Sequence, residues 1–173
     1  MQDKFWKILI VIVLTGVIAV LVFLFVNSSP KEERQVLGNE IVEQGRNHIS
    51  QGSKDHGPYN SNPPTSGPHW PTPAECKIYD DQVPDEAAIH SLEHGAIWIT
   101  YKDKNDGELV NKLKDLVSKN PSKVLLSPRE ANDSTIALAS WARLLKVEEF
   151  DGEQINNFIR SNRNTGPEPF AQC

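Results

Sequence analysis

Several residue types that often reveal a function are scarce in this sequence. Lysine and arginine form no cluster and are not interleaved with aromatic residues, so nucleic-acid binding is not expected. Acidic residues outnumber basic ones by 23 to 18, a small excess that mainly favours solubility, although it can attract cations. No internal repeat is visible. Composition therefore indicates one ordinary acidic domain, and any sign of its function has to come from individual residues and motifs.

Cysteine is also scarce, with only Cys76 and Cys173 in the chain. In an oxidising compartment two cysteines predict one disulfide, which here would tie the C-terminus to the loop around Cys76. Closing so long a loop contributes roughly 4–5 kcal/mol in the chain-entropy model. The alternative is that the thiolates bind a soft metal ion, because sulfur ligands suit copper(I) and zinc.

One long stretch without charge stands near the N-terminus, where 19 residues run from Ile8 to Val26. At about 1.5 Å per residue, a helix of this length nearly spans a hydrocarbon core of roughly 30 Å. We therefore predict a transmembrane helix over 8–26, with residues 1–7 before it and a linker over 27–34 after it. The run exceeds the roughly 7–15 apolar residues of a secretory signal, although cleavage near Ser28 is an alternative.

The direction of this span follows from length, because positive charge is nearly balanced on its two sides. Only seven residues precede the span and 147 follow it. We expect a single-pass anchor in the cell membrane, residues 1–7 in the cytoplasm and a domain over 35–173 on the extracytoplasmic side. The sequence names no protein partner.

A segment rich in proline and glycine, residues 50–84, interrupts this domain. Proline lacks an amide donor and disfavours helix in the residue before it, so neither a helix nor a central strand fits here. Tyr59, Trp70, His56 and His69 argue against a disordered tether, because tethers are poor in such residues. A long ordered loop of this kind is usually functional.

The rest of the domain alternates between helical and strand patterns. Apolar residues at helical spacing and capping residues predict helices, and alternation predicts strands. The helices are expected from Ser29 to about Gly45, over 84–94, over 108–119 and after Asp151; the strands are expected over 96–101, over 123–128 and in the first half of 134–150. The sum is an α+β domain with a mostly antiparallel sheet flanked by helices.

The five histidines are the residues that suggest chemistry. His90 and His94 are four positions apart on the predicted helix, with Glu93 between them, opposite an apolar arc. An i, i+4 pair brings two imidazoles within reach of one ion. The alternative is the polar face of an ordinary surface helix. His48, His56 and His69 lie in the flanking irregular segments, so a ring of three or four donors is feasible.

These donors lead to three hypotheses. The first is a copper or zinc site with His69, His90 and His94 as ligands, His48 as a fourth, and Glu93 as a ligand or an acceptor that orients an imidazole.

The second hypothesis is a zinc-dependent hydrolase, since His90 to His94 spells H-x-x-E-H with Glu93 as general base. That signature needs a further acidic ligand downstream, for which Glu130, Glu148 and Glu149 are unmarked candidates. Ser66 lacks the strand–turn–helix context of a nucleophile. The third hypothesis is a non-catalytic partner-binding module in which the histidines are structural, and catalysis is the less favoured outcome.

Two motifs, "NPPTSGPHW" and "HSLEHGAIWITY", resemble a bacterial family of uncharacterised domains of unknown function that are membrane-anchored or secreted. The resemblance covers about His48 to Tyr101 and continues loosely to "FIRSNRNTGPEP". The matching positions are His48, Tyr59, Pro63, Pro64, Ser66, Gly67, Pro68, His69, His90, Glu93, His94 and Gly95. His56 and Cys76 are not part of the pattern. The resemblance implies no activity, but it groups His48, His69, His90 and His94, with Tyr59 and Ser66 as supporting residues.

Overall fold

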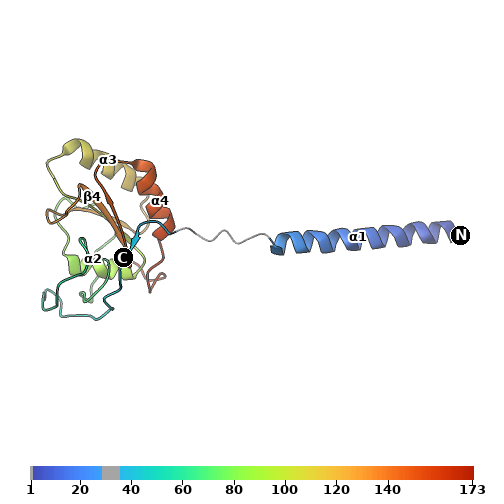
Figure 1. Cartoon of the computed structure of the whole chain (residues 1–173), viewed down its shortest axis with the longest axis horizontal. Helices are drawn as coiled ribbons and strands as arrows, with labels where there is room; N and C mark the ends of the chain where they lie inside the picture. The colour runs from blue at the N-terminus through green and yellow to red at the C-terminus, as the bar shows by residue number, and fades with distance from the viewer. Residues whose placement is uncertain (1, 29–35) are drawn as a thin grey trace. The chain divides into compact units, whose positions relative to one another are not determined.

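The computed structural model describes residues 2–28 and 36–173, which divide into two compact units. One unit is the helix α1 (Gln2–Ser28), and the other contains the remaining elements labelled in Figure 1. The two units are described separately below.

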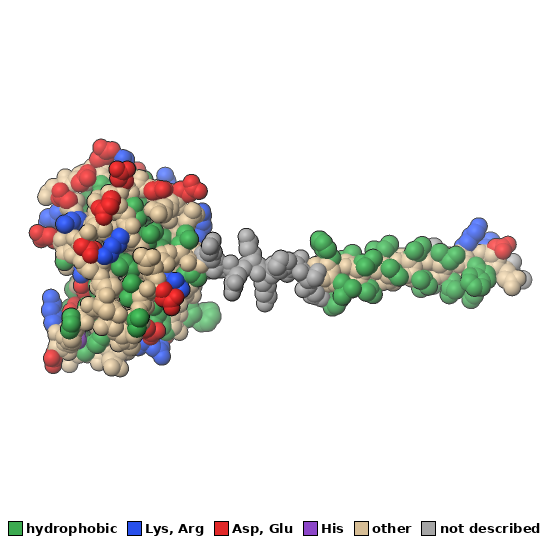
Figure 2. All heavy atoms as spheres, viewed as in Figure 1, with side chains coloured by type: hydrophobic (Ala, Val, Ile, Leu, Met, Phe, Trp, Pro, Cys, Tyr) green, Lys and Arg blue, Asp and Glu red, His purple; other side chains and the backbone are tan. Residues whose placement is uncertain are grey.

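Helix α1 is 27 residues long and carries apolar side chains along its length, drawn in green in Figure 2. Among the residues described, its part from Gln2 to Phe25 is the one helix long and apolar enough to cross a membrane. This part includes nearly all of the predicted span over 8–26. A signal sequence near the N-terminus has the same properties, so α1 is a candidate membrane segment without an assigned orientation.

The second unit is built on a five-stranded sheet with the order β1-β5-β4-β2-β3. The strands are β1 (Asn39–Glu40), β2 (Ile97–Tyr101), β3 (Val124–Pro128), β4 (Ile136–Ser140) and β5 (Arg143–Val147). Three of the four strand pairings are antiparallel, and only β2 and β3 run parallel. The predicted α+β domain with a mostly antiparallel sheet is confirmed.

Helices cover both faces of this sheet. They are α2 (Asp85–Glu93), α3 (Gly107–Ser118) and α4 (Gly152–Asn162). Ile97, Ile99 and Tyr101 of β2 pack into the core that α3 and α4 cover, whereas Trp98 packs into the core beneath α2. Figure 1 shows α3 and α4 apart from α2, with the strands between them. The sheet therefore separates the histidine-bearing helix from the other two.

Capping residues mark the starts of α3 and α4. The Asp106 carboxylate accepts a hydrogen bond from the Leu109 amide, and the Asp151 carboxylate accepts from the amides of Glu153 and Gln154. Each carboxylate satisfies amides that lack a partner within the helix. The helices predicted over 108–119 and after Asp151 are confirmed.

The helix predicted from Ser29 to about Gly45 is wrong over its described part, and its predicted start lies outside the described residues. The chain is extended there and forms the short edge strand β1, which pairs with β5. Gly38 has a φ of +95°, and a Cβ at this position would lie 2.7 Å from the Phe158 ring and 3.1 Å from the Leu144 carbonyl oxygen. Contacts with α4 and β5 thus override the local helical pattern.

Residues 134–150 form the hairpin of β4 and β5, so the second half of this segment is a strand as well. The tight turn between the strands includes Ala142, whose φ is +54°. Sequence periodicity alone did not identify β5, because polar and apolar residues do not alternate along it: Arg143 and Lys146 flank the apolar pair of Leu144 and Leu145.

Candidate metal centre

Helix α2 carries three of the candidate residues and has ends that its sequence explains. Pro84 is its N-cap, where the missing amide costs no hydrogen bond. Gly95 follows its end with a φ of +80°, and a Cβ there would lie 2.7 Å from the Cα of Asn164. The helix predicted over 84–94 is confirmed, and its end is fixed against a segment about 70 residues away in the chain.

The side of α2 that bears the histidines is buried, which corrects the alternative of an exposed polar face. His90, Glu93 and His94 are 6%, 4% and 8% exposed. The proline-rich loop covers this side, because the Trp70 amide donates to the Glu86 carbonyl and the Ala74 amide donates to the Ala87 carbonyl. Burying so many polar groups requires partners for them.

His48 and His69 lie side by side because their backbones pair like two parallel strands. The His69 amide donates to Asn47, the Ile49 amide donates to His69, and the Gly67 amide donates to Gly45. His69 is fully buried, whereas His48 is exposed. This pairing presents two imidazoles to α2, one inside the domain and one at its surface.

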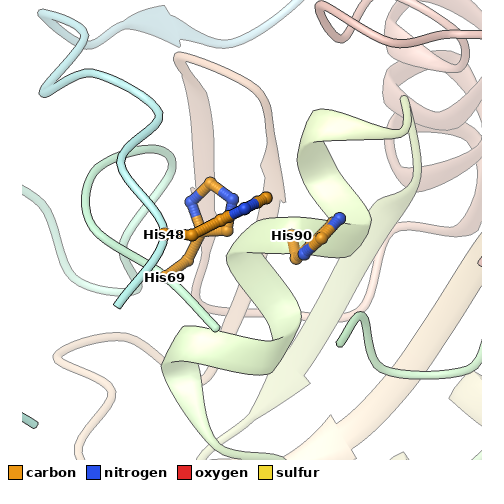
Figure 3. A group of neighbouring side chains, drawn as sticks. All are labelled: His48, His69 and His90. Carbon is orange, nitrogen blue, oxygen red and sulfur yellow. The ribbon is translucent and has the colours of Figure 1, made fainter. Parts of the chain in front are cut away.

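The rings of His48, His69 and His90 meet at this point (Figure 3). One ring nitrogen of each lies within 4.8 Å of one ring nitrogen of the other two. The ring centroids are 4.9 Å apart for His48 and His69, 5.0 Å for His48 and His90, and 5.1 Å for His69 and His90. Three histidines from two loop segments and a helix are thus close enough to hold one metal ion.

The buried imidazoles of His69, His90 and His94 each donate a hydrogen bond from Nδ1 to a backbone carbonyl. The distances are 2.8 Å from His69 to Gly67, 2.6 Å from His90 to Trp70 and 2.7 Å from His94 to Gln172. A carbonyl only accepts, so each Nδ1 carries a hydrogen. In a neutral ring the Nε2 atom is then an unprotonated acceptor.

The Nε2 atoms nevertheless face other acceptors. Nε2 of His90 lies 3.0 Å from Nε2 of His94, and Nε2 of His69 lies 3.0 Å from Oε2 of Glu93. With all three rings neutral and Glu93 ionised, lone pairs would point at lone pairs in a buried site. Such contacts require additional protons or a cation between them.

Burial lowers the pKa of His90, and the neighbouring rings of His94, His69 and His48 lower it further, while the bond to the Trp70 carbonyl acts in the opposite direction. The environment therefore favours neutral His90 over its imidazolium form. A neutral imidazole is the form that binds a metal ion.

Charged groups surround the cluster on its outer side. The Arg46 guanidinium lies 3.7 Å from Oε1 of Glu93 and is 52% exposed, and Oε2 of Glu168 lies 3.9 Å from Nε2 of His94. Trp141 lies edge-on to His69, and its buried indole nitrogen has no acceptor among the residues described. A cation at the cluster would therefore have the carboxylates of Glu93 and Glu168 nearby.

His94 and His56 differ in their relation to this cluster. His94 is not one of the three residues whose nitrogens are mutually close, but it extends the cluster through its contact with His90. His56 lies elsewhere: its Nδ1 bonds to the Gly57 carbonyl, and its Nε2 lies 3.3 Å from Glu86. Four of the five histidines are therefore connected, and His56 has its own carboxylate.

Tyr59 and Ser66 organise the loop that carries His69. The Tyr59 hydroxyl donates to the Pro68 carbonyl, and the Ser66 hydroxyl accepts from the Gln44 amide. Burial and the nearby carboxylates of Glu86 and Asp85 raise the pKa of Tyr59, which keeps its hydroxyl protonated and donating. Both residues act on the backbone beside His69 rather than on its ring.

Cys76 and Cys173 form a disulfide, with their Cα atoms 5.4 Å apart. Neither sulfur is then available as a thiolate. The acidic candidates for a hydrolase also lie away from the histidines, because Glu130 lines a hollow with Lys102, and Glu148 accepts from Thr135. The carboxylate nearest to His94 belongs instead to Glu168.

The sequence did not single out Arg46, Glu168 or Gln172 as parts of this site. Gln172 contributes only its backbone carbonyl, for which no side-chain type gives a signal. Arg46 stands two residues before His48, and this short spacing is the one sequence feature that could have placed Arg46 near the site.

A family model described as "Protein of unknown function (DUF3105)" matches residues 50–173. The match includes His69, α2 and both cysteines, while His48 and Arg46 precede it. No curated protein and no solved structure matches the chain.

Proposed function

The chain belongs to the DUF3105 family, whose function is unknown, and on that premise we propose that its folded domain binds copper or zinc. The ligands are His69, His90 and His94, with His48 as the fourth. Glu93 orients His69 or joins the coordination. The role of the domain is to hold this ion, and no reaction is assigned to it.

The observation that carries this proposal is the direction of the buried Nε2 atoms. Nδ1–H bonds to Gly67, Trp70 and Gln172 fix the rings of His69, His90 and His94 and leave each Nε2 lone pair free. Metal-binding histidines characteristically donate their other ring N–H to a carbonyl or a carboxylate in this way.

The spacing of the nitrogens also supports an ion. Two nitrogens bonded at about 2.0–2.1 Å to a tetrahedral ion are roughly 3.3 Å apart. The 3.0 Å between Nε2 of His90 and Nε2 of His94 is close to that value. The nitrogens of His48, His69 and His90 already lie within 4.8 Å of one another, so His94, which is outside this group, is the ring that has to move closer for all four to share one ion.

Protons are the competing explanation, and they correspond to a module with purely structural histidines. A proton shared by His90 and His94 would relieve their contact, but it would place a charge where burial lowers the pKa of His90. The His69–Glu93 contact differs, because one proton between an imidazole nitrogen and a carboxylate oxygen makes a charge-assisted hydrogen bond. The His90–His94 contact is therefore the stronger argument for a metal ion.

The donor set favours borderline metals over soft ones. It consists of imidazoles and a carboxylate, and the disulfide removes both thiolates. Imidazole suits zinc and copper, whereas sulfur ligands would favour copper(I) in particular. Zinc(II) and copper(II) are the ions to test first.

The proposed location is the cell membrane, with α1 as a single-pass anchor and the metal domain on the extracytoplasmic side. The disulfide supports this side, because disulfides persist in oxidising compartments. Processing of α1 as a signal sequence would release the same domain into that compartment.

A zinc-dependent hydrolase is the second candidate, and the position of Glu93 is what favours it. Its carboxylate lies beside His69 and within the H-x-x-E-H segment, where a general base for a bound water belongs. The Glu93→Gln variant should then keep its metal ion and lose turnover.

Thermal unfolding of the full-length chain in detergent tests the metal proposal. After treatment with a chelator, zinc or copper(II) should raise the melting temperature of the wild type and of the control variant His56→Ala. The His69→Ala variant should show no such rise. An unchanged melting temperature of the wild type with both ions would contradict the proposal.

A further inference from the structure

Residues 164–173, here called the strap, run across the end of α2. The Asn164 amide donates to the Gly95 carbonyl, and the Glu168 amide donates to the Glu93 carbonyl, both at 2.9 Å. Gly166 packs so closely that a side chain there would collide with the carbonyls of Leu92 and Glu93. The strap therefore lies directly on the residues that connect α2 to β2.

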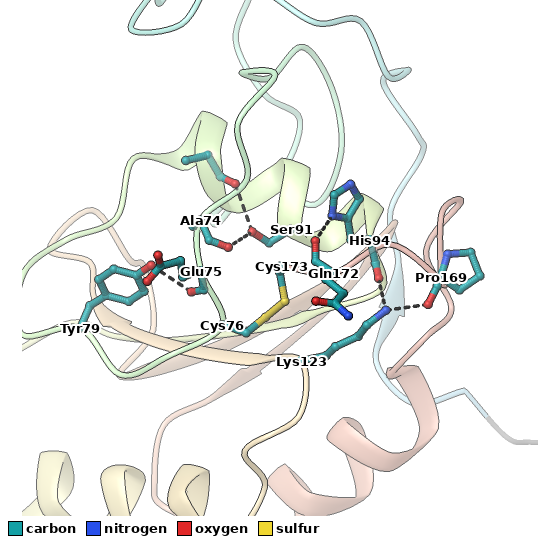
Figure 4. Close-up of a disulfide and its surroundings, with 11 residues drawn as sticks. Ala74, Glu75, Cys76, Tyr79, Ser91, His94, Lys123, Pro169, Gln172 and Cys173 are labelled. Carbon is teal, nitrogen blue, oxygen red and sulfur yellow. Dashed lines mark hydrogen bonds between the residues drawn. A yellow bond between two sulfur atoms is a disulfide. The ribbon is translucent and has the colours of Figure 1, made fainter.

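The strap also holds His94 at two points (Figure 4). The Gln172 carbonyl accepts from Nδ1 of His94 at 2.7 Å. The Lys123 ammonium group donates to the carbonyls of His94 and Pro169, at 2.7 and 2.6 Å, and so joins the helix end to the strap. The orientation of the His94 ring thus depends on a segment 78 residues away.

The disulfide fixes the strap one residue beyond this contact. Cys173 follows Gln172 and is bonded to Cys76. Cys76 belongs to the proline-rich loop and stands two residues after Ala74. Ala74 in turn is held against α2, because the Ser91 hydroxyl donates to the Ala74 carbonyl at 2.7 Å. Both partners of the disulfide therefore belong to segments attached to the helix that carries His90 and His94.

We propose that the strap sets the metal affinity of the centre through His94 and that the Cys76–Cys173 disulfide makes this affinity redox-dependent. A dithiol reductant would supply two electrons and two protons, leaving two thiols on the protein and a disulfide on the reductant. Gln172 would then be free to move away, and His94 would lose the acceptor that fixes its tautomer. This inference rests on the proposed metal site.

The expected size of the effect follows from the kind of contact that is lost. Removing a group that orients a metal-bound histidine typically weakens metal binding by about 10–100-fold. The ligands His69 and His90 keep their carbonyl acceptors in other segments, so the site should be weakened rather than abolished.

Chelator competition with zinc on the full-length chain in detergent gives the test. The Cys76→Ser/Cys173→Ser variant and reduced wild type, freed of reductant under anaerobic conditions, should both bind zinc about 10–100-fold more weakly than oxidised wild type. Unchanged affinity in the double serine variant would overturn the proposal. A second outcome would also overturn it: weak binding by the serine variant together with full affinity in the reduced wild type. Reduction would then not weaken the site, because a freed cysteine thiolate would bind the zinc ion itself.

Two further variants separate the strap from general destabilisation. Lys123→Met should weaken zinc binding without changing a cysteine or a ligand, whereas Lys114→Met, which removes a surface lysine paired with Asp80, should not. In a His94→Ala background, loss of the disulfide should cause no additional weakening. A further loss in that background would contradict an effect that acts through His94.

A readout without metal keeps this inference distinct from the proposed function. If oxidised wild type binds no zinc, the metal proposal fails. The ¹⁵N chemical shifts of the His94 ring in metal-free protein still report whether the strap holds its tautomer. They should indicate protonated Nδ1 in the oxidised chain and a mixture after loss of the disulfide, and identical shifts in the two would overturn the mechanical link.

Discussion

His90 and His94 meet through their Nε2 atoms, 3.0 Å apart inside the domain, although each ring already donates its Nδ1 hydrogen to a backbone carbonyl. Two neutral rings in this arrangement repel each other. The contact is stable only with a shared proton or a cation, and this choice determines whether the cluster is a structural or a metal-binding feature.

Loss of His90 should separate these two roles. We predict that His90→Ala lowers zinc affinity by more than the roughly 10–100-fold expected for an orienting group, because it removes a ligand. Metal-free stability should fall as well, since the hydrogen bond to Trp70 is lost. If the loss of stability were the same with and without zinc, the histidine would be structural only.

The carboxylate of Glu93 should matter through His69. We predict that Glu93→Gln weakens zinc binding by about 10–100-fold, because an amide orients an imidazole less strongly than a carboxylate. The matched control is Glu86→Gln on the same helix, where the buried carboxylate contacts His56 instead. Equal effects of the two substitutions in chelator competition would show that the loss is not specific to the cluster.

The disulfide should also stabilise the fold in the absence of metal. It joins residues 97 positions apart, and removal of such a bridge costs about 2–5 kcal/mol of unfolding free energy. Urea unfolding of the Cys76→Ser/Cys173→Ser variant in chelator, followed by circular dichroism, measures this cost. If the unfolding free energies of this variant and of the wild type agreed within about 0.5 kcal/mol, which is the effect of a neutral surface substitution, the prediction would be contradicted.

Arg129 should be a strong structural anchor of the proline-rich loop. Its buried guanidinium holds both carboxylate oxygens of Asp85 at the start of α2, and it also donates to Asn62 and Asn132. Removing one member of a buried ion pair costs about 3–5 kcal/mol, so Arg129→Met should destabilise the domain by roughly that amount in urea unfolding.

A second substitution tests the cause of that loss. Adding Asp85→Asn to Arg129→Met removes the carboxylate left without its partner, and part of the lost stability should return. A double variant less stable than Arg129→Met alone would mean that Asp85 stabilises the domain independently of the arginine.

The elements predicted best from the sequence are those whose signals are local. Pro84 and Gly95 bracket α2, and the alternation of Ile97, Trp98 and Ile99 identifies β2 and its two faces. Periodicity failed where distant contacts dominate. Gly38 lies against Phe158 and Leu144, and these contacts hold the chain around it in an extended conformation that its local pattern did not predict.

The candidate site was predictable to a similar extent. Residue type and spacing brought attention to His90 and His94, and the loop composition indicated that His69 would be ordered. The groups that orient these rings were not predictable, because they are carbonyls of Gly67, Trp70 and Gln172, and any residue supplies a carbonyl. Their role follows from the path of the backbone alone.

X-ray absorption at the zinc edge tests the central claim most directly. The zinc-loaded full-length chain should contain one ion per chain, surrounded by three or four nitrogen or oxygen atoms at about 2.0–2.1 Å with the scattering pattern of imidazole. Failure to retain stoichiometric zinc, or a first shell with sulfur at about 2.3 Å, would contradict the account.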